Sequence, residues 1–241
     1  MAGVRDHFMS LPQISTRVLL QIEHIEKFYA AYQSALVFYR PERIGDNTAG
    51  LPEHIRNQLS RGNIPVVLRD TPPEPDEPDQ VPDGLIFDTG DLKRYMLDHG
   101  QREIFENSLI LLFNSIEGFV RSRIEAIESK EFKGYVTPES LERAGITGPA
   151  EATEGLFILR EARNAFVHNE SIWDAKAAAK LSKMLTGTAD ETYPLTLKTL
   201  QGKTLAFNVE NRISLALDGT AVFRWFTAQM KALIAGVDCD L

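Results

Sequence analysis

Cysteine is almost absent from this sequence: Cys239 is the only one among 241 residues. A single cysteine excludes an internal disulfide and a zinc site built from several cysteines. Long apolar runs are also missing, because the longest have five residues, as in 109–113, whereas a membrane-spanning helix needs about 20. The first residues lack the apolar stretch and small-residue cleavage site of a signal peptide. We therefore expect a cytoplasmic protein with no membrane partner.

Basic charge is scarce as well. The chain has 26 Lys and Arg against 34 Asp and Glu, a net charge of −8, which argues against the broad basic surface of most nucleic-acid-binding proteins. The deficit is uneven, however, because residues 70–84 contain six acids and no base. Removing those six from −8 leaves −2 for the rest of the chain. A local cationic site on the folded part is therefore compatible with the composition.

The acidic run 70–84 also contains five prolines. Proline lacks the amide hydrogen that the interior of a helix or sheet requires, so this run is predicted to be a solvated linker or long loop. It divides the chain into an N-terminal helical region, residues 1–69, and a C-terminal domain, residues 85–241. With 43% apolar residues, the chain can bury a core.

The N-terminal region has helical periodicity. Apolar side chains recur every three or four residues from Ile14 to Tyr39 and stop before Pro41, which predicts a long amphipathic helix. A shorter helix is predicted at 52–59, with an Arg-Gly-Asn turn signal soon after it. Two helices cannot form much core alone, so we expect them to pack on the C-terminal domain or on a second copy of the chain.

The C-terminal domain is predicted to be a helical bundle with a small β insertion. Helical periodicity covers about 92–130, 138–144, 149–168 and 220–235. Between the last two helices, turn signals separate β-rich runs at 195–197, 204–209 and 212–217. These runs predict a hairpin or a three-stranded meander. The predicted fold class is therefore mainly α.

The stretch 156–170, LFILREARNAFVHNE, is the most informative part of the chain. At about 100° per residue it separates into two helical faces. The apolar face, directed toward a core, consists of Ile158, Leu159, Ala162, Ala165 and Phe166. The opposite face consists of Arg160, Arg163, Asn164, Val167 and His168. Arg163 lies about 140° from His168 around the helix axis, but its long side chain can swing toward the imidazole. No carboxylate lies within this polar face, and Glu161 only borders it.

The hexapeptide Arg163-Asn164-Ala165-Phe166-Val167-His168 resembles the Rx4–6H motif of the HEPN superfamily, many members of which are RNases and toxins. In that family the motif lies near the end of an inner helix of an all-α bundle that begins with a long helix. The helices predicted at 92–130 and 220–235 fit this order. The resemblance covers about residues 92–237, and it implies a HEPN-like helical bundle with residues 1–69 as an N-terminal helical extension.

The resemblance also implies roles for three residues. His168 would be the general acid or base toward a ribose 2′-hydroxyl or the leaving 5′-oxygen, Arg163 would stabilise the charged phosphorane, and Asn164 would orient the site. Imidazole titrates near neutral pH, and a guanidinium matches phosphate oxygens bidentately, so the residue types suit these roles. Because the 2′-hydroxyl supplies the nucleophile, we expect no metal and no other cofactor.

Two further polar residues leave alternatives open. Arg160 is either a second contact to a substrate phosphate or the ion-pair partner of Glu161 or Glu154. Glu117, on the helix predicted at 92–130, either lines the same cleft or forms a surface ion pair with Arg121 four residues later.

The function implied by the resemblance is a metal-independent RNA endonuclease, acting as a toxin or a phage-defence effector. A homodimer is expected, because one motif supplies a single histidine and cannot easily provide both an acid and a base. One subgroup of the family is controlled by an antitoxin that modifies a tyrosine two residues after the motif histidine. Glu170 occupies that position here, so control would fall to another antitoxin or regulatory partner. The alternatives are a catalytically inactive module that binds nucleotide or RNA, and a helical scaffold for oligomerisation.

Overall fold

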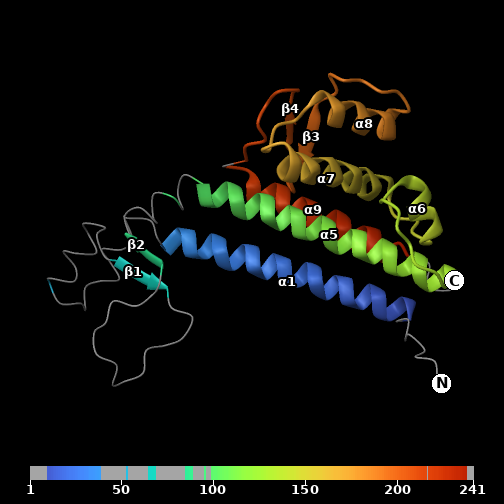
Figure 1. Cartoon of the computed structure of the whole chain (residues 1–241), viewed down its shortest axis with the longest axis horizontal. Coiled ribbons are helices and arrows are strands. Elements are labelled where there is room, and N and C mark those ends of the chain that lie inside the picture. Colours follow the sequence, from blue (N-terminus) through green and yellow to red (C-terminus); the bar gives the residue numbers. More distant parts are fainter. Residues whose placement is uncertain are drawn as a thin grey trace. The chain divides into compact units, whose positions relative to one another are not determined.

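The computed structural model describes residues 10–38, 53, 65–68, 85–88, 95, 99–215 and 217–237. The chain divides into unit 1, residues 1–29 and 102–241, and unit 2, residues 30–101. The described part is mainly helical, as predicted, with two small antiparallel strand pairs (Figure 1). Among the described helices, none has the length and apolarity needed to cross a bilayer.

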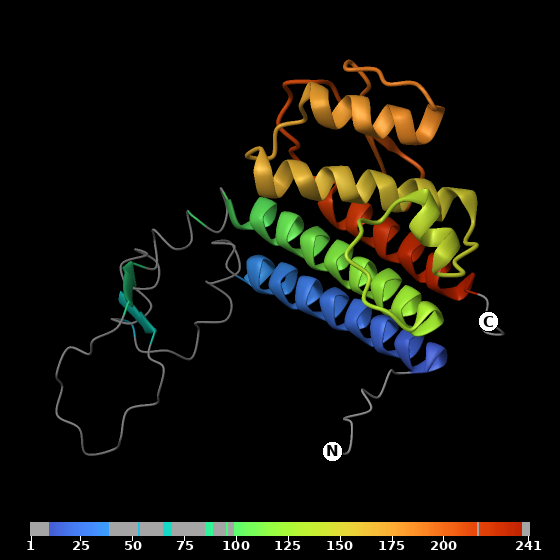
Figure 2. The same cartoon turned by 45° about the vertical axis from the view of Figure 1, so that its right-hand side comes forward.

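Three long helices form one side of unit 1. They are α5 (Gln101–Glu128), α9 (Gly219–Ala235) and the part of α1 (Leu11–Phe38) that ends at Tyr29. In both Figure 1 and Figure 2, α1 runs alongside α5, and α7 (Ala150–His168) lies over α5 and α9. The outer surface of α7 is covered by α8 (Ala175–Thr186). The core therefore lies between α7 and the three long helices.

The first helix packs on the C-terminal helices. Its buried side chains follow the predicted three- and four-residue spacing: Ile14, Val18, Ile22, Ile25 and Tyr29. The ring of Tyr29 stacks on Phe223 of α9 with 4.2 Å between centroids, and Lys231 Nζ of α9 lies 2.6 Å from Glu26 Oε2. The expectation that this helix packs on the C-terminal part is confirmed for residues 11–29.

Helix α5 positions the segment that follows it, through the place where the helix ends and through a hydrogen bond from Arg123. It ends at Glu128 because Ser129 adopts a left-handed conformation with φ 54°. Arg123 of this helix is fully buried and donates from Nε to the carbonyl oxygen of Ala144 at 2.7 Å. That bond holds the end of the short helix α6 (Pro138–Arg143), whose first turn is capped by Thr137.

The predicted helix boundaries agree with α6, α7 and α9 to within a few residues. The helix predicted from residue 92 is described as α5 from Gln101 onward, and of residues 92–98 only Tyr95 is described. The linker predicted at 70–84 and the helix predicted at 52–59 lie outside the described residues, apart from Glu53.

The β insertion is a hairpin. Strand β3 (Leu195–Lys198) pairs antiparallel with β4 (Thr204–Phe207), with Leu195 opposite Phe207. The third strand of the alternative meander does not form. Glu210 has φ 67°, which turns the chain away from β4, and the amide of Ile213 donates to the carbonyl oxygen of Ser171 at 2.8 Å instead. Within the described part of this run, Arg212 and Ile213 therefore pair with the loop that follows α7.

Sequence reasoning did not predict α8 or a second strand pair. The N-cap Asp174 accepts from the amide of Ala177, and Gly187 ends α8 with φ 82°. In unit 2, β1 (Pro65–Leu68) pairs antiparallel with β2 (Leu85–Asp88). These two strands flank the acidic proline-rich run on either side in the sequence.

Gly118 lies inside α5, and a glycine within a helix predicts a close contact with another helix, because it otherwise costs about 1 kcal/mol relative to alanine. This prediction is wrong, because Gly118 is exposed and a Cβ there would have nothing within 4 Å. We expect Gly118→Ala to raise the free energy of unfolding by up to about 1 kcal/mol. Thermal unfolding would then shift upward by roughly 2–4 °C.

Gly236 provides the contrasting control. A Cβ at Gly236 would lie 2.9 Å from the Cα of Gly148, a backbone atom that cannot rotate away. Gly236→Ala should therefore lower the melting temperature. A fall in melting temperature with Gly118→Ala would show that this face of α5 is in contact after all.

Candidate functional site

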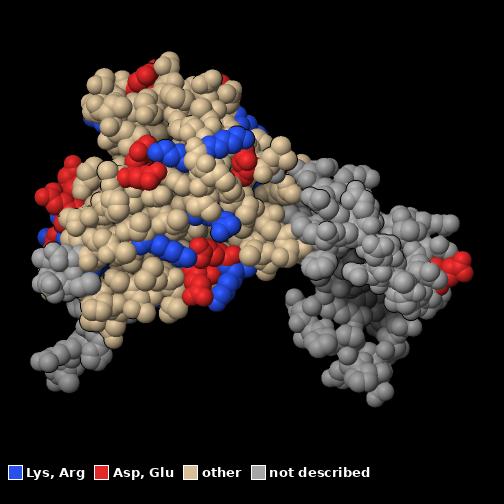
Figure 3. Space-filling view, turned by 180° about the vertical axis from the view of Figure 1, so that it is seen from behind, with Lys and Arg blue, Asp and Glu red and all other residues tan. Residues whose placement is uncertain are grey.

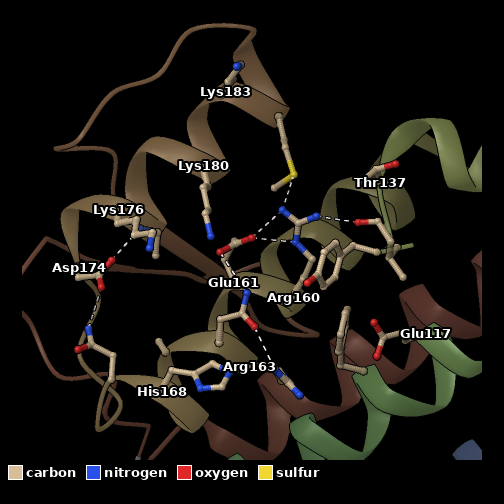
Figure 4. Close-up of a pocket in the computed structure, with 18 of the residues that line it drawn as sticks. Glu117, Thr137, Arg160, Glu161, Arg163, His168, Asp174, Lys176, Lys180 and Lys183 are labelled. Atoms are coloured by element: carbon tan, nitrogen blue, oxygen red, sulfur yellow. Dashed lines mark hydrogen bonds and ion pairs between the residues drawn. The ribbon is translucent and has the colours of Figure 1, made fainter. Parts of the chain in front are cut away.

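The polar face of α7 borders a cavity of about 1160 Å³ (Figure 4). Its other walls are the segment 135–139, helix α8, and Phe113 and Glu117 of α5. The site residues predicted from the sequence all line this cavity: Arg160, Arg163, Asn164 and His168. Charged residues that were not predicted line it as well: Glu161, Asp174, Lys176, Lys180 and Lys183. The opposite face of α7 is buried as predicted at Ile158, Leu159, Ala162 and Ala165.

The side chain of Arg163 extends along α7 to His168. Nη1 of Arg163 lies 3.5 Å from Nε2 of His168 and donates to Oδ1 of Asn164 at 3.2 Å. The guanidinium also lies over the ring of Phe113, with 5.9 Å between Cζ and the ring centroid. Within the described part of the chain, the buried Nε of Arg163 has no hydrogen-bond partner. The separation of about 140° around the helix axis is therefore bridged by the arginine side chain.

His168 is the last residue of α7, and its side chain is exposed at the cavity. Its exposure leaves one edge of the ring open to a ligand, while Arg163 lies on the other side in Figure 4.

Arg160 has a different environment from Arg163. It forms an ion pair with Glu161, with 2.7 Å between Nη2 and Oε1. It also donates from Nη1 to the carbonyl oxygen of Val136 at 2.7 Å and from Nη2 to Sδ of Met184 at 2.8 Å. Of the two interpretations left open by the sequence, the structure shows the ion pair, with Glu161 and not Glu154. Arg160 thereby connects α7 to the segment before α6 and to α8.

Glu161 is one of the site residues that were not predicted from the sequence as part of the site. Its side chain is only 2% exposed, and its carboxylate accepts from Arg160 Nε at 2.8 Å and from Asn164 Nδ2 at 3.4 Å. The helical wheel placed Glu161 at the border of the polar face, but α8 covers that border and buries it. The carboxylate therefore orients Asn164, which in turn contacts Arg163.

The turn after His168 is held by polar contacts with α5 and α8. Glu170 and Ser171 both have positive φ, 49° and 65°. Asn169 Nδ2 donates to the carbonyl oxygen of Ile172 at 2.7 Å and to Asp174 at 3.2 Å. Ser171 Oγ donates to Glu106 Oε1 of α5 at 2.7 Å. These contacts fix the end of α7 and hence the backbone position of His168.

Burial raises the pKa of Glu106, although the hydrogen bond from Ser171 and the charges of Arg102 and Arg212 act in the opposite direction. The folded protein therefore holds this proton more tightly than the unfolded chain. Stability should fall as the pH rises from about 4.5 through the raised pKa, because ionisation is then penalised only in the folded state. Glu106→Gln, which keeps an acceptor for Ser171, should lack this loss.

Urea unfolding of wild type and Glu106→Gln between about pH 4 and pH 8 measures the effect. The stability of wild type relative to the variant should decline across this range. Parallel pH profiles would contradict the assignment of the shift to Glu106.

The structure also bears on the remaining candidates. Glu117 lines the cavity, and among the described residues it forms no ion pair with Arg121. Within the same part of the chain, no group of three or more His, Cys, Asp and Glu side chains is placed to hold a metal ion.

No protein-family model matches this chain, and neither the curated proteins nor the solved structures include a match. The case for a function therefore depends on the motif and on the geometry of this cavity.

Proposed function

We propose that this protein is a metal-independent RNA endonuclease of the HEPN type. The observation that carries the proposal is the approach of Arg163 Nη1 to within 3.5 Å of His168 Nε2 at the wall of an open cavity. A permanent cation and an imidazole, the side chain that most often transfers protons in enzymes, are thereby presented together to a ligand.

The reaction that this pair suits is transesterification within RNA. The ribose 2′-oxygen attacks the adjacent phosphorus as a base removes the hydroxyl proton, and the bond from phosphorus to the 5′-oxygen breaks as an acid protonates that oxygen. The products are a 2′,3′-cyclic phosphate and a 5′-hydroxyl. His168 would transfer one of the two protons, and Arg163 would stabilise the negative charge of the phosphorane.

Two neighbouring residues of α7, Asn164 and Arg160, would support Arg163 and His168 by positioning them. Asn164 would orient Arg163 through the 3.2 Å hydrogen bond. The contacts of Arg160 with Glu161, Val136 and Met184 favour a role in holding the cavity walls together over the substrate-binding role.

The biological role that we propose is that of a toxin or phage-defence effector in the cytoplasm, restrained by an antitoxin or another regulatory partner. The direct test compares cleavage of labelled RNA by wild type and by His168→Ala. A protein that binds RNA without cleaving it would support the second candidate, a catalytically inactive nucleotide- or RNA-binding module.

We expect the active form to be a homodimer, because one motif provides one imidazole and the reaction needs both an acid and a base. His168 is exposed and so accessible to a second copy. The outer face of α1 carries exposed apolar side chains that can extend the contact: Leu19, Leu20 and Phe28, which are 40%, 60% and 48% exposed.

Light scattering should give a mass near twice 27.0 kDa, and specific activity should fall on dilution below the dimer dissociation constant. Leu20→Glu, which places a charge on the outer face of α1, should weaken the dimer if this face takes part. A monomer with full specific activity would contradict the two-histidine arrangement.

A further inference from the structure

Helix α8 carries a row of lysines along the cavity. Lys176, Lys180 and Lys183 follow one another at four- and three-residue spacing, so they share one face of the helix. The buried side chains of α8 lie on the opposite face; they are Ala178, Leu181 and Ser182. All three lysines are exposed and line the cavity (Figure 4). The row extends over about 10 Å along the helix axis.

These lysines lack the carboxylate partners that other lysines have. Among the described residues, no ion pair involves Lys176, Lys180 or Lys183, whereas Lys27 and Lys203 lie 2.7 Å from Glu23 and Asp218. On the face of the molecule in Figure 3, acidic and basic side chains are likewise interspersed.

Two of the carboxylates that line the cavity, Glu161 and Asp174, already have other partners. Glu161 pairs with Arg160, and Asp174 caps α8 and accepts from Asn169. Like charges at four-residue spacing destabilise a helix, and the chain as a whole is acidic. An uncompensated cationic row is therefore best explained by an anionic ligand that spans several contacts.

The cavity wall formed by segment 135–139 presents an aromatic ring. Tyr135 is 79% exposed and lines the cavity. Its backbone is held in place, because the carbonyl oxygen of the next residue, Val136, accepts from Arg160, and Thr137 and Ser140 form a capping box. An exposed ring on a fixed backbone is a platform on which a nucleobase can stack.

We propose that single-stranded RNA binds in this cavity with its phosphates along Lys176, Lys180 and Lys183 and one unstacked base on Tyr135. This inference rests on the proposed function in one respect: the strand would present a phosphodiester to Arg163 and His168. A duplex offers phosphates but keeps its base faces stacked, so it can use the lysines but not the ring. Neither the lysines nor the ring recognises a 2′-hydroxyl, so single-stranded DNA should bind with similar affinity and inhibit competitively.

The test measures binding of a fluorescent single-stranded RNA oligonucleotide to full-length His168→Ala, which should leave the strand intact, as a function of salt. In that background, K176Q/K180Q/K183Q should weaken binding roughly 10- to 100-fold at 0.15 M salt. The slope of log K against log salt should become shallower by about 2, since each phosphate contact on a single strand contributes about 0.7. The charge-matched control K27Q/K130Q/K203Q changes lysines that do not line the cavity, and it should keep the parent slope.

The ring is tested separately with Tyr135→Leu and Tyr135→Trp. The leucine variant should bind single strands roughly tenfold more weakly, because base stacking is lost, while its affinity for duplex RNA stays the same. The tryptophan variant should retain affinity for single strands. Circular dichroism and melting temperature would confirm that each variant is folded, and with exposed side chains no loss of fold is expected.

The outcomes distinguish this site from the proposed function. An unchanged affinity and salt slope in the triple lysine variant, an equal loss in the control, or no binding of single strands would overturn the binding site. If wild type never cleaves RNA but the lysine variant loses binding, the nuclease proposal fails and the binding site stands. If wild type cleaves RNA and the lysine variant binds normally, the binding site alone fails.

Discussion

His168→Ala and Arg163→Ala should each abolish detectable RNA cleavage while leaving the protein folded. Loss of a general acid or base typically costs 10²–10⁴-fold in rate, and loss of a donor that stabilises developing charge costs about 10²–10³-fold. His168 is exposed, so its removal should change the free energy of unfolding by no more than about 0.5 kcal/mol. Arg163→Ala removes one hydrogen bond to Asn164 and the packing over the ring of Phe113, and the protein should stay folded.

Arg160→Ala is the informative contrast, because Arg160 lies on α7 three residues before Arg163. The side chain of its partner Glu161 is 2% exposed, so removing Arg160 leaves a buried carboxylate without its ion pair. We expect a loss of about 3 kcal/mol in the free energy of unfolding. A melting curve therefore separates a structural arginine from a catalytic one within a single helix.

Arg121→Ala serves as the matched neutral control, since Arg121 is an exposed arginine of α5 that does not line the cavity. It should change neither cleavage nor stability. If His168→Ala or Arg163→Ala cleaves as well as wild type, these residues have no part in the mechanism. A collapse in the melting temperature of His168→Ala would indicate a structural role instead.

The second large effect concerns the substrate. A single 2′-deoxy substitution on the 5′ side of the cleaved bond should stop cleavage at that position, because it removes the nucleophile. The same oligonucleotide should still bind, since the groups that line the cavity include cations and an aromatic ring that contact phosphates and bases. Gel analysis of an RNA with one defined cleavage site, with and without the substitution, gives the result directly.

A deoxy substitution at a position away from the cleaved bond is the control, and it should leave the rate unchanged. Equal cleavage of the deoxy substrate, or of DNA, would require a nucleophile other than the 2′-hydroxyl. The roles proposed for Arg163 and His168 would then have to be abandoned.

The motif helix could be predicted from sequence because its two faces differ so clearly. The buried positions Ile158, Leu159, Ala162 and Ala165 alternate with polar ones at helical spacing, and each packs as the wheel requires. The sequence indicated only that the side chain of Arg163 is long enough to reach His168, not that it does so. A wheel gives the direction of Cβ, whereas the 3.5 Å approach depends on side-chain torsions and on Phe113 beneath the guanidinium.

The burial of the Glu161 carboxylate and the row of lysines on α8 were not predicted, and the reason is the same for both. Both depend on α8, a helix of 12 residues whose buried face is small, with Ala178 and Ser182 beside Leu181, although its lysines lie clearly on the opposite face. Its start and stop signals were present in the sequence, with Asp174 as N-cap and Gly187 as the left-handed end. Without α8, Glu161 lies at an open border; with it, the same carboxylate is enclosed and Arg160 is its partner.

The alternative of a third strand at 212–217 was wrong for a different reason. Ile213 and Leu215 alternate and are both buried, which is the pattern of a strand. The amide of Ile213 nevertheless donates to Ser171 in the loop after α7, and the carbonyl oxygen of Leu215 accepts from Gly219, because the turn at Glu210 directs the chain away from β4. Side-chain alternation reports which residues are buried, but it does not identify the backbone partner.

The central claim is best tested by the chemistry of the cleaved ends. Wild-type protein and a short RNA would be incubated in EDTA, and the products would be identified by mass spectrometry. Attack by the 2′-hydroxyl predicts fragments that end in a 2′,3′-cyclic phosphate or its 3′-phosphate hydrolysis product, with 5′-hydroxyl ends on the other side of the cut. Activity that disappears in EDTA and returns with magnesium, or products with a 5′-phosphate and a 3′-hydroxyl, would contradict the mechanism assigned to Arg163 and His168.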